Sequence, residues 1–502
     1  MAAPLFRNKS LKELLDRYKR VWSIGHGLRL MGWDLEVYMP EKGAKERSEA
    51  SSQLELMMQR EFLALKALTK EAARAKNLNV YEKGVVRCNQ RDLDYFTKIP
   101  PKLIERMAKA TSNGFIAWRT AREKSEFKIF RPLLDEIVHL NREKADKLGY
   151  KGHPYNALLD MYEEGFTVNA ADRMFGNMIP QIKRITEKIL AEGRFPQTHP
   201  LEKAKYKNDD VRKVNEHLLK VLGMPSDRFR MDLSAHPFTM EIGGNDVRIT
   251  TRYEGVDFKT SLYSTIHESG HAIYALNYDQ RLEMTPAGSG VSLGVHESQS
   301  RLWENIIGRS RQFTDLIYPN VVKNIPFARK YSRDSMYKYF NSVKPSLIRV
   351  EADEVTYNFH VYLRYEIEKK LMAGKLSVSE LPQYWNDMME EYVGVRPKKD
   401  SDGVLQDVHW AHGSIGYFPT YVVGNVVGAL SVAAMERSMG KAVFWDRVRH
   451  GQFKPIKSWL EQKIQKWCSV YPPAELQQMV FRTSYDPKAF VEYLKGKYLD
   501  NK

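Results

Sequence analysis

The sequence of 502 residues predicts a mainly α-helical protein with one small β-sheet. Over residues 5–230 apolar side chains recur at spacings of three and four, the period of a helix with one buried face, as in 46–76. From Thr260 onward the helical pattern resumes and continues to the C-terminus. Residues 239–255 differ, because two short strand-like runs flank a Gly-Gly-Asn turn, which indicates a β-hairpin.

The breaks between the predicted helices are short. Proline and glycine interrupt the pattern, but no long linker, fixed-period repeat or low-complexity tract divides the chain. We therefore predict a single unit over residues 1–502, with approximate lobes at 1–230 and 231–502 that share a core. Residues 421–435 are too few to span a bilayer and are rich in small side chains, so they predict a tightly packed buried helix and no membrane partner.

Composition narrows the cellular setting and the partners. Hydrophobic residues make up 43% and charged residues 28%, which is typical of a globular protein. The start of the chain has no apolar signal region, and the two cysteines form no C-x-x-C pair, so we expect a reducing, cytoplasmic location. The net charge of +16 is spread along the chain and mixed with acids, which argues against a nucleic-acid partner.

The stretch STIHESGHAIYAL (264–276) contains two histidines four residues apart. On a helix His267 and His271 lie on one face, where two imidazoles can share a zinc ion. Glu268 can then act as the general base toward a water in the open coordination position. Gly270, between the histidines, permits another segment of the chain to approach closely. The pattern predicts a zinc peptidase helix, although a chance match is the alternative.

A catalytic zinc needs a third protein ligand. The metzincin pattern is excluded, because Tyr274 and Asn277 stand where it requires glycine and histidine. A glutamate on a later helix is the other solution. We favour Glu297, near the start of a predicted helix and beside His296, which could orient a ligand; Glu304 is the competing candidate.

Three further stretches concentrate polar residues. Each also has a purely structural interpretation, as an exposed strand, a surface ion pair or core aromatic residues with satisfied hydroxyls. The stretches are DVRIT (246–250) with Arg248, IRVEAD (348–353) with Arg349 and Asp353 one helical turn apart, and GVLQDVHWAHGSIGYFPTY (403–421) with His409, His412, Tyr417 and Tyr421.

Together these motifs resemble the Taq-type thermostable metallocarboxypeptidases, most of all their archaeal members. The resemblance covers essentially the whole chain, and no motif position departs from the family pattern. The five motifs, in the family's order, are HESGH (267–271), DVRIT, HESQ (296–299), IRVEAD and GVLQDVHW (403–410).

The resemblance implies a fold and an activity. It implies a large helical, neurolysin-like fold with two lobes around a deep groove, and usually a homodimer; the sequence pattern itself places the small sheet beside the metal site. It implies removal of single residues from peptide C-termini with broad specificity. It assigns His267, His271 and Glu297 as metal ligands and Glu268 as general base, with zinc as the default metal and cobalt as an alternative activating metal.

The remaining polar residues suggest roles in hydrolysis. The oxyanion that develops at the attacked carbonyl needs hydrogen-bond donors besides the metal. His409, Tyr417 and Tyr421 are the candidates, because the predicted loop can direct them toward the site. After the attack, Glu268 can pass its proton to the leaving amine.

Trimming chain ends also requires recognition of a free C-terminal carboxylate. Arginine does this best, through two parallel charge-assisted hydrogen bonds. Arg349 is the first candidate, with Glu351 and Asp353 expected to hold it, and Arg248 is the second. The DVRIT strand is expected to pair its edge with the extended substrate backbone, which would give affinity without sequence selectivity.

Two alternatives stay open at this stage. An oligopeptidase or endopeptidase could use the same zinc site without an arginine at the end of the groove, and it would be indifferent to amidation of the substrate. A basic nucleic-acid-binding or scaffold protein with a vestigial site would hold little metal.

Overall fold

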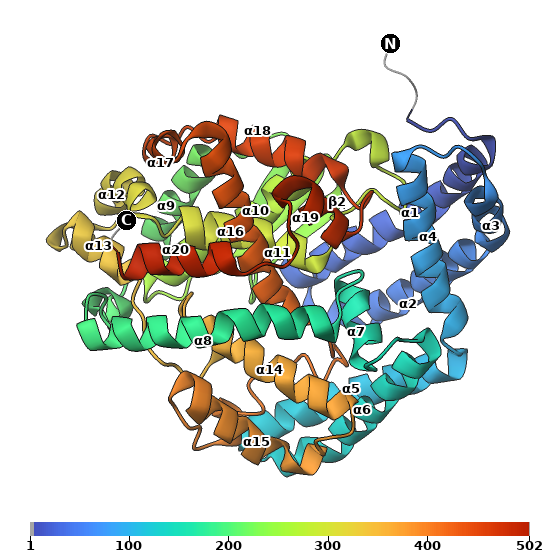
Figure 1. The fold of residues 1–502 in the computed structure, drawn as a ribbon, viewed down its shortest axis with the longest axis horizontal. Helices are drawn as coiled ribbons and strands as arrows, with labels where there is room; N and C mark the ends of the chain where they lie inside the picture. Colours follow the sequence, from blue (N-terminus) through green and yellow to red (C-terminus); the bar gives the residue numbers. More distant parts are fainter. Residues whose placement is uncertain (1–4, 501–502) are drawn as a thin grey trace.

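A computed structural model describes residues 5–500 (Figure 1), and it confirms a mainly α-helical fold with one small sheet. The α-helices are α1 (Lys9–Val37), α2 (Ala44–Leu63), α3 (Lys66–Arg74), α4 (Val80–Lys98), α5 (Pro101–Lys124), α6 (Phe127–Leu148), α7 (Tyr155–Tyr162), α8 (Val168–Glu192), α9 (Asn208–Val221), α10 (Phe258–Leu276), α11 (Leu293–Arg301), α12 (Arg311–Asn324), α13 (Arg333–Phe340), α14 (Tyr357–Met372), α15 (Leu381–Met388), α16 (Pro419–Met439), α17 (Lys441–Arg449), α18 (Lys454–Lys463), α19 (Pro473–Phe481) and α20 (Lys488–Tyr498).

Local sequence signals set many helix ends. Helix α4 begins with a capping box, in which the Asn79 side chain accepts from the backbone of Glu82 and the Glu82 side chain accepts from the backbone of Asn79. Helix α8 begins at the side-chain cap of Thr167 and ends at Gly193, whose left-handed φ of 62° suits glycine.

The sheet has three strands in the order β1 (Phe229–Leu233), β3 (Asp246–Thr251), β2 (Thr239–Gly243). Strands β2 and β3 form the predicted antiparallel hairpin, whereas β1, which was not predicted, pairs with β3 in parallel. The expectation that the DVRIT strand pairs its edge with a substrate is wrong. That strand is β3, and both of its edges already bind neighbouring strands, so β2 is the edge strand on the hairpin side.

Helices α10, α11 and α16 form the centre of the molecule, with α1–α4 on one side in Figure 1. The predicted buried helix at 421–435 is confirmed, because α16 is buried over most of its length. It packs closely on α11, and a Cβ atom added at Gly424 would lie 2.6 Å from Cγ of Glu297. The largest hydrophobic cluster in the described residues runs from Trp118 to Tyr498, and a separate cluster packs around α1, α3 and α4, while the division into two lobes at residue 230 stays a prediction.

None of the helices in residues 5–500 combines the length and apolarity needed to cross a bilayer.

Candidate active site

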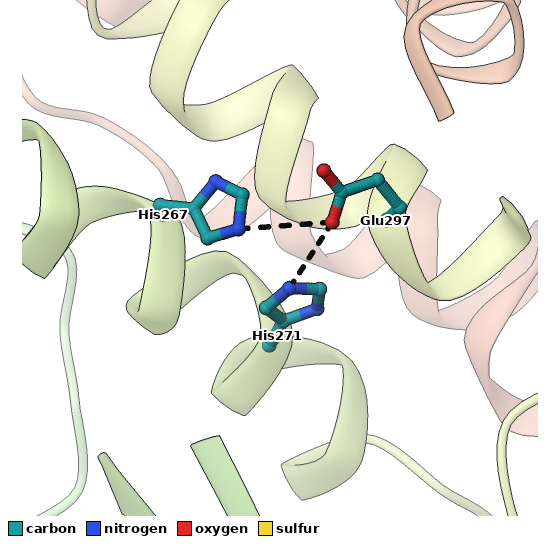
Figure 2. A group of neighbouring side chains, drawn as sticks. All are labelled: His267, His271 and Glu297. Carbon is teal, nitrogen blue, oxygen red and sulfur yellow. Dashed lines mark ion pairs between the residues drawn. The ribbon is translucent and has the colours of Figure 1, made fainter. Parts of the chain in front are cut away.

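Three predicted ligands converge where α10 meets α11. Figure 2 shows the imidazoles of His267 and His271, from α10, directed at the carboxylate of Glu297, from α11. The Nε2 atoms of the two histidines lie 3.7 Å and 3.4 Å from Oε2 of Glu297. One ligand atom from each residue lies within 4.8 Å of the others, which is close enough for a single ion to contact all three.

The close approach of α10 and α11 depends on Gly270. A Cβ atom at this position would lie 2.6 Å from Cα of Ser300 and 2.7 Å from the carbonyl oxygen of Gln299. Any other side chain would therefore push the two helices apart. The glycine allows the approach expected from the sequence and brings Glu297 to the histidines.

Glu304 lies behind His267 rather than beside the three ligands. Its Oε2 is 2.8 Å from Nδ1 of His267, and its Oε1 accepts from Arg309 at 3.2 Å. Glu304 is carried on a short π-helical turn, η4 (Leu302–Ile307). Burial alone would raise the pKa of Glu304, but its hydrogen bond to His267 and the charge of Arg301 lower that pKa to about 2.

A second chain of hydrogen bonds orients His271. Its Nδ1 lies 2.6 Å from Nδ1 of His296, and Nε2 of His296 lies 2.7 Å from Oε1 of Glu241, on β2. If Nε2 of His271 offers its lone pair to a metal, Nδ1 carries the proton and donates to His296. His296 then donates from Nε2 to the Glu241 carboxylate, so a single set of tautomers satisfies the whole chain.

One carboxylate oxygen of Glu297 accepts a hydrogen bond from Arg301, and the other faces the two histidines. Arg301, one turn along α11, donates its Nε–H to Oε1 at 2.7 Å, and its guanidinium lies 4.6 Å from the ring centroid of Tyr357. Burial opposes ionisation, but the Arg301 charge and the two histidines hold the pKa of Glu297 well below its usual value. Oε2 therefore faces the imidazoles as a carboxylate oxygen.

Glu268 is placed to handle a proton. It is buried, and the hydroxyl of Thr239 on β2 donates to its Oε2 at 2.6 Å. Burial raises the pKa of Glu268, because removing water disfavours the charged form. Its other oxygen, Oε1, accepts no hydrogen bond from the described residues, so it is available to a water.

The donor set fits a divalent metal. Two imidazole nitrogens and one carboxylate oxygen, with a general base beside them and no fourth side chain in the group among residues 5–500, make a three-ligand site with an open position. Each ligand is also held by an outer partner, as catalytic metal sites require.

Arg349 is nearly fully buried, and its partner differs from the one expected. The guanidinium donates to Oδ1 of Asp407 from Nε at 3.1 Å and from Nη2 at 2.8 Å, and to the hydroxyl of Tyr357 at 3.0 Å. The expectation that Glu351 and Asp353 hold it is wrong. Residues 349–351 form a 3-10 turn, after which the Asp353 carboxylate accepts from Val355 and Thr356 in the turn that precedes α14.

Asp407 is shared between two arginines. Its Oδ1 accepts from Arg349, and its Oδ2 accepts from Nε of the fully buried Arg364 at 2.7 Å. The side chain of Gln406 binds both the backbone of Arg349 and the Arg364 guanidinium. Burial opposes the charge, but the two guanidiniums hold the pKa of Asp407 far below its usual range. The cluster therefore carries a net charge of about +1 in a buried setting.

His409 and the two tyrosines gather beside this cluster. Nε2 of His409 lies 3.2 Å from the hydroxyl of Tyr421, whose ring stacks beside Arg349, and the Tyr417 ring packs against both. Burial lowers the pKa of His409 to about 4, so its imidazole is neutral at pH 7. His412 is separate, since it is exposed and stacks on Phe115.

Arg248 belongs to a different environment. On β3 it donates to both oxygens of Asp246, at 2.7 Å and 2.6 Å, and its guanidinium lies 5.6 Å from the ring of Trp33 on α1. This bidentate pair leaves Arg248 little net charge, so Arg349 is the better placed of the two candidates.

Comparison with known proteins decides the family. The model of the carboxypeptidase Taq (M32) metallopeptidase family matches residues 11–498. The chain belongs to this family. Thermostable carboxypeptidase 1 of Pyrococcus furiosus is 46% identical to it over 501 residues, which cover 99% of both chains. Carboxypeptidase 1 of Bacillus subtilis is 34% identical over 491 residues, 97% of each chain.

Solved structures agree with the family assignment. The structure of Pyrococcus furiosus carboxypeptidase, described as Apo-Mg, matches this fold with a TM-score of 0.97 at 45% identity, over 99% of this chain and 100% of that one. The predicted resemblance is thus confirmed. As a Taq-type (M32) peptidase, the chain is a metallocarboxypeptidase, a peptide hydrolase that depends on a divalent metal.

Sequence reasoning missed several residues of this M32 site. Arg301 contacts the ligand Glu297 and Asp407 contacts Arg349, while Glu241 acts through His296 and Arg364 through Asp407. None of the four was selected from the sequence. Asp407 lay within the quoted GVLQDVHW motif, so its charge among apolar neighbours was a usable signal. Glu241 and Arg364 offered no such signal, because their partners are distant in sequence.

Proposed function

We propose that this metallocarboxypeptidase binds zinc through His267, His271 and Glu297 and releases single amino acids from peptide C-termini with broad specificity. The observation that carries the proposal is the convergence of these three ligand atoms beside the buried carboxylate of Glu268. Zinc is favoured over magnesium, because two of the three donors are imidazoles. Cobalt accepts the same donors and is an alternative activating metal.

The metal would supply a Lewis acid that polarises the peptide carbonyl and lowers the pKa of water. Glu268 takes the proton of the attacking water at its available Oε1, while Thr239 holds Oε2 in place. The same carboxyl then passes the proton to the leaving amine.

The oxyanion of the attacked carbonyl needs donors that are already in place. His409, neutral at pH 7, and the hydroxyls of Tyr417 and Tyr421 provide three N–H or O–H groups. Their proximity to both Glu297 and Arg349 supports this role, because, besides burial, the charges of these two residues shift the pKa of both tyrosines.

Arg349 is proposed to bind the C-terminal carboxylate of the substrate. A guanidinium has five N–H donors, and the bonds to Asp407 and Tyr357 use three of them. The two that remain suffice for a bidentate pair with a carboxylate. The excess positive charge of the cluster with Arg364 favours an anion, whereas Arg248 is already paired with Asp246.

A time course of a peptide followed by mass spectrometry tests this function. A peptide with a free C-terminus should lose residues one at a time from that end, and the C-terminal amide of the same peptide should resist. Internal fragments, or equal cleavage of the amide, would instead support an oligopeptidase or endopeptidase.

Two variants test the assigned roles. Glu268→Gln should keep the metal and lose turnover, and retained activity would mean that another base acts. Arg349→Ala should lower kcat/KM on free-carboxylate peptides by at least about tenfold, since a charge-assisted hydrogen bond contributes roughly 1.5–3 kcal/mol. Arg248→Ala is the matched control and should leave the carboxylate preference intact. The reverse pattern would assign the clamp to Arg248.

Metal analysis tests the choice of ion. Gently purified protein should contain about one zinc ion per chain. A chelator should abolish activity, and zinc or cobalt should restore it, whereas restoration by magnesium alone would contradict the zinc proposal. A homodimer and a cytoplasmic location remain part of this proposal, supported by the family resemblance and by the reduced cysteine usage respectively, and light scattering can test the first.

A further inference from the structure

A cavity of about 730 Å³ opens from the catalytic site toward α1 and α4. It begins at the site itself, because Thr239, which binds Glu268, and His296, which binds His271, both line it. Arg349 and Asp407, the groups proposed to receive the C-terminal carboxylate, are not in its lining. The cavity therefore adjoins the metal ligands but does not include the carboxylate site.

The edge strand β2 sets the direction in which a bound peptide would run through this cavity. Thr239, at the start of β2, contacts the catalytic Glu268, and the strand then runs along the cavity to Gly243 and Gly244. An extended peptide that pairs antiparallel with β2 has its C-terminal end at Thr239 and its upstream residues in the cavity. Gly244 lies five positions beyond Thr239, so a side chain opposite Gly244 would lie about five residues upstream of the cleaved bond.

The lining of the cavity is acidic, although the protein as a whole is basic. It contains six carboxylates and three guanidiniums in a chain with a net charge of +16. Arg87 and Arg91 are already paired with Glu164 and Asp160, and Asp279 is paired with an arginine outside the lining. Arg29 is then the one guanidinium that faces the remaining three carboxylates, which are Asp92, Glu241 and Glu283.

Of these three carboxylates, Asp92 has the fewest groups that offset its negative charge. It is solvent-exposed and has no hydrogen bond or ion pair with any residue in the described part of the chain. The neighbouring guanidinium of Arg91 is committed to Asp160, so the negative charge of Asp92 is left uncompensated. Glu283 sits at the far end of β2, where it accepts from the backbone N–H of Gly244 at 3.1 Å.

We propose that this cavity binds a cationic group of the substrate upstream of the cleaved bond and that Asp92 and Glu283 determine this preference. The group is the side chain of a lysine or arginine, or the α-ammonium of a short peptide, since both supply the same charge and hydrogen-bond donors. Glu241 lines the same space but is held by His296 and Tyr278, so it contributes mainly background charge. This inference rests on the proposed function, because the direction of the cavity follows from Arg349 as the carboxylate site.

The test uses zinc-loaded enzyme and peptides that share their last two residues. Lysine, glutamine or glutamate is placed two, three, four or five residues before the cleaved bond, each with a free and an acetylated N-terminus. The expected result is a kcat/KM about tenfold higher for lysine than for glutamate near the fifth position, and the difference should shrink at high salt. If acetylated peptides keep the preference for lysine over glutamate, the lysine side chain is the bound group. If acetylation removes the preference, the α-ammonium is the bound group. Both outcomes support a cation site.

Asp92→Asn and Glu283→Gln should each reduce the lysine-to-glutamate ratio toward one. Asp94→Asn is the matched control on the same helix, because Asp94 bonds Gln90 and Lys98 and does not line the cavity. Binding of the same peptides to zinc-loaded Glu268→Gln, measured by fluorescence anisotropy, gives a readout that does not need turnover. Equal trimming of all peptides, or a lysine preference unchanged in both variants, would overturn the inference. Failure to trim any peptide would instead refute the proposed function.

Discussion

Replacement of Gly270 by alanine should separate the two helices that carry the metal ligands. The new Cβ would lie 2.6 Å from Cα of Ser300, while ordinary contacts begin at 3.4 Å, so α11 must move by about 0.8 Å or more. The contacting atoms are backbone, so no side chain can rotate away. Overpacking of this kind costs roughly 1–3 kcal/mol, which exceeds the gain of about 1 kcal/mol from replacing a helical glycine.

The effect on metal binding should exceed the effect on folding. Metal–ligand distances tolerate deviations of only about 0.2 Å, and Glu297 lies three residues before Ser300 on the displaced helix. Gly270→Ala should therefore weaken zinc binding by at least about tenfold, as measured by titration against a competing chelator, with a smaller loss in urea unfolding of the apo-protein.

Gly176→Ala is the matched control for this prediction. Gly176 is also inside a helix, α8, but a Cβ atom there would meet nothing within 4 Å. This variant should bind zinc normally and should be as stable as the parent protein or more so. If Gly270→Ala behaves in the same way, the close approach of α10 and α11 does not position Glu297, and the reasoning is refuted.

Three other perturbations have expected outcomes. Burial raises the pKa of Glu368 to about 7, so the stability that Glu368 contributes is complete below its unfolded pKa of 4.5 and is lost as the pH rises through 7. Glu368→Gln should therefore remove about 3 kcal/mol of pH dependence from the free energy of urea unfolding between pH 4 and 8. An unchanged pH profile would contradict this. Asp407→Asn leaves two buried guanidiniums without a countercharge and should lower the unfolding free energy by about 3–5 kcal/mol, whereas a neutral result would show that Arg349 and Arg364 find other partners. Zinc at about 1,000 times its Kd should stabilise the protein by about 4 kcal/mol over the chelated form, and equal melting temperatures would mean that the ligands bind no metal in the folded protein.

The parts of the site that follow from local sequence were predictable. His267, Glu268 and His271 share one turn of a helix, so their spacing alone places them on one face. The hairpin was also local, because its turn residues and two strands are contiguous. Glu297 required the assumption of a second helix, which the structure contains as α11.

The errors arose where long-range pairing overrides local pattern. Strand β1 pairs directly with β3 in parallel although β2 lies between them in the sequence, a contact that no local period reveals. Asp353 was paired with Arg349 by assuming a regular helix, but a 3-10 turn ends after residue 351, and Asp407, 58 residues away, takes its place. Asp353 is not free to pair with Arg349, because its carboxylate already accepts from the backbone N–H groups of Lys344, Val355 and Thr356.

The two proposed subsites have opposite charge, and this has a consequence for how a peptide is selected. The cluster of Arg349, Arg364 and Asp407 carries about one excess positive charge, and the cavity with Asp92, which does not include that cluster, carries an excess of negative charge. A free peptide has the complementary distribution, with a carboxylate at its C-terminus and cationic groups upstream. Such an electrostatic field orients the substrate peptide before any of its side chains is recognised. The enzyme can therefore trim from one end and still accept many different side chains. Because the two charges act together, Arg349→Ala and Asp92→Asn should be non-additive in kcat/KM for a peptide with an upstream lysine, and strict additivity in a double-mutant cycle would show that the two subsites act independently.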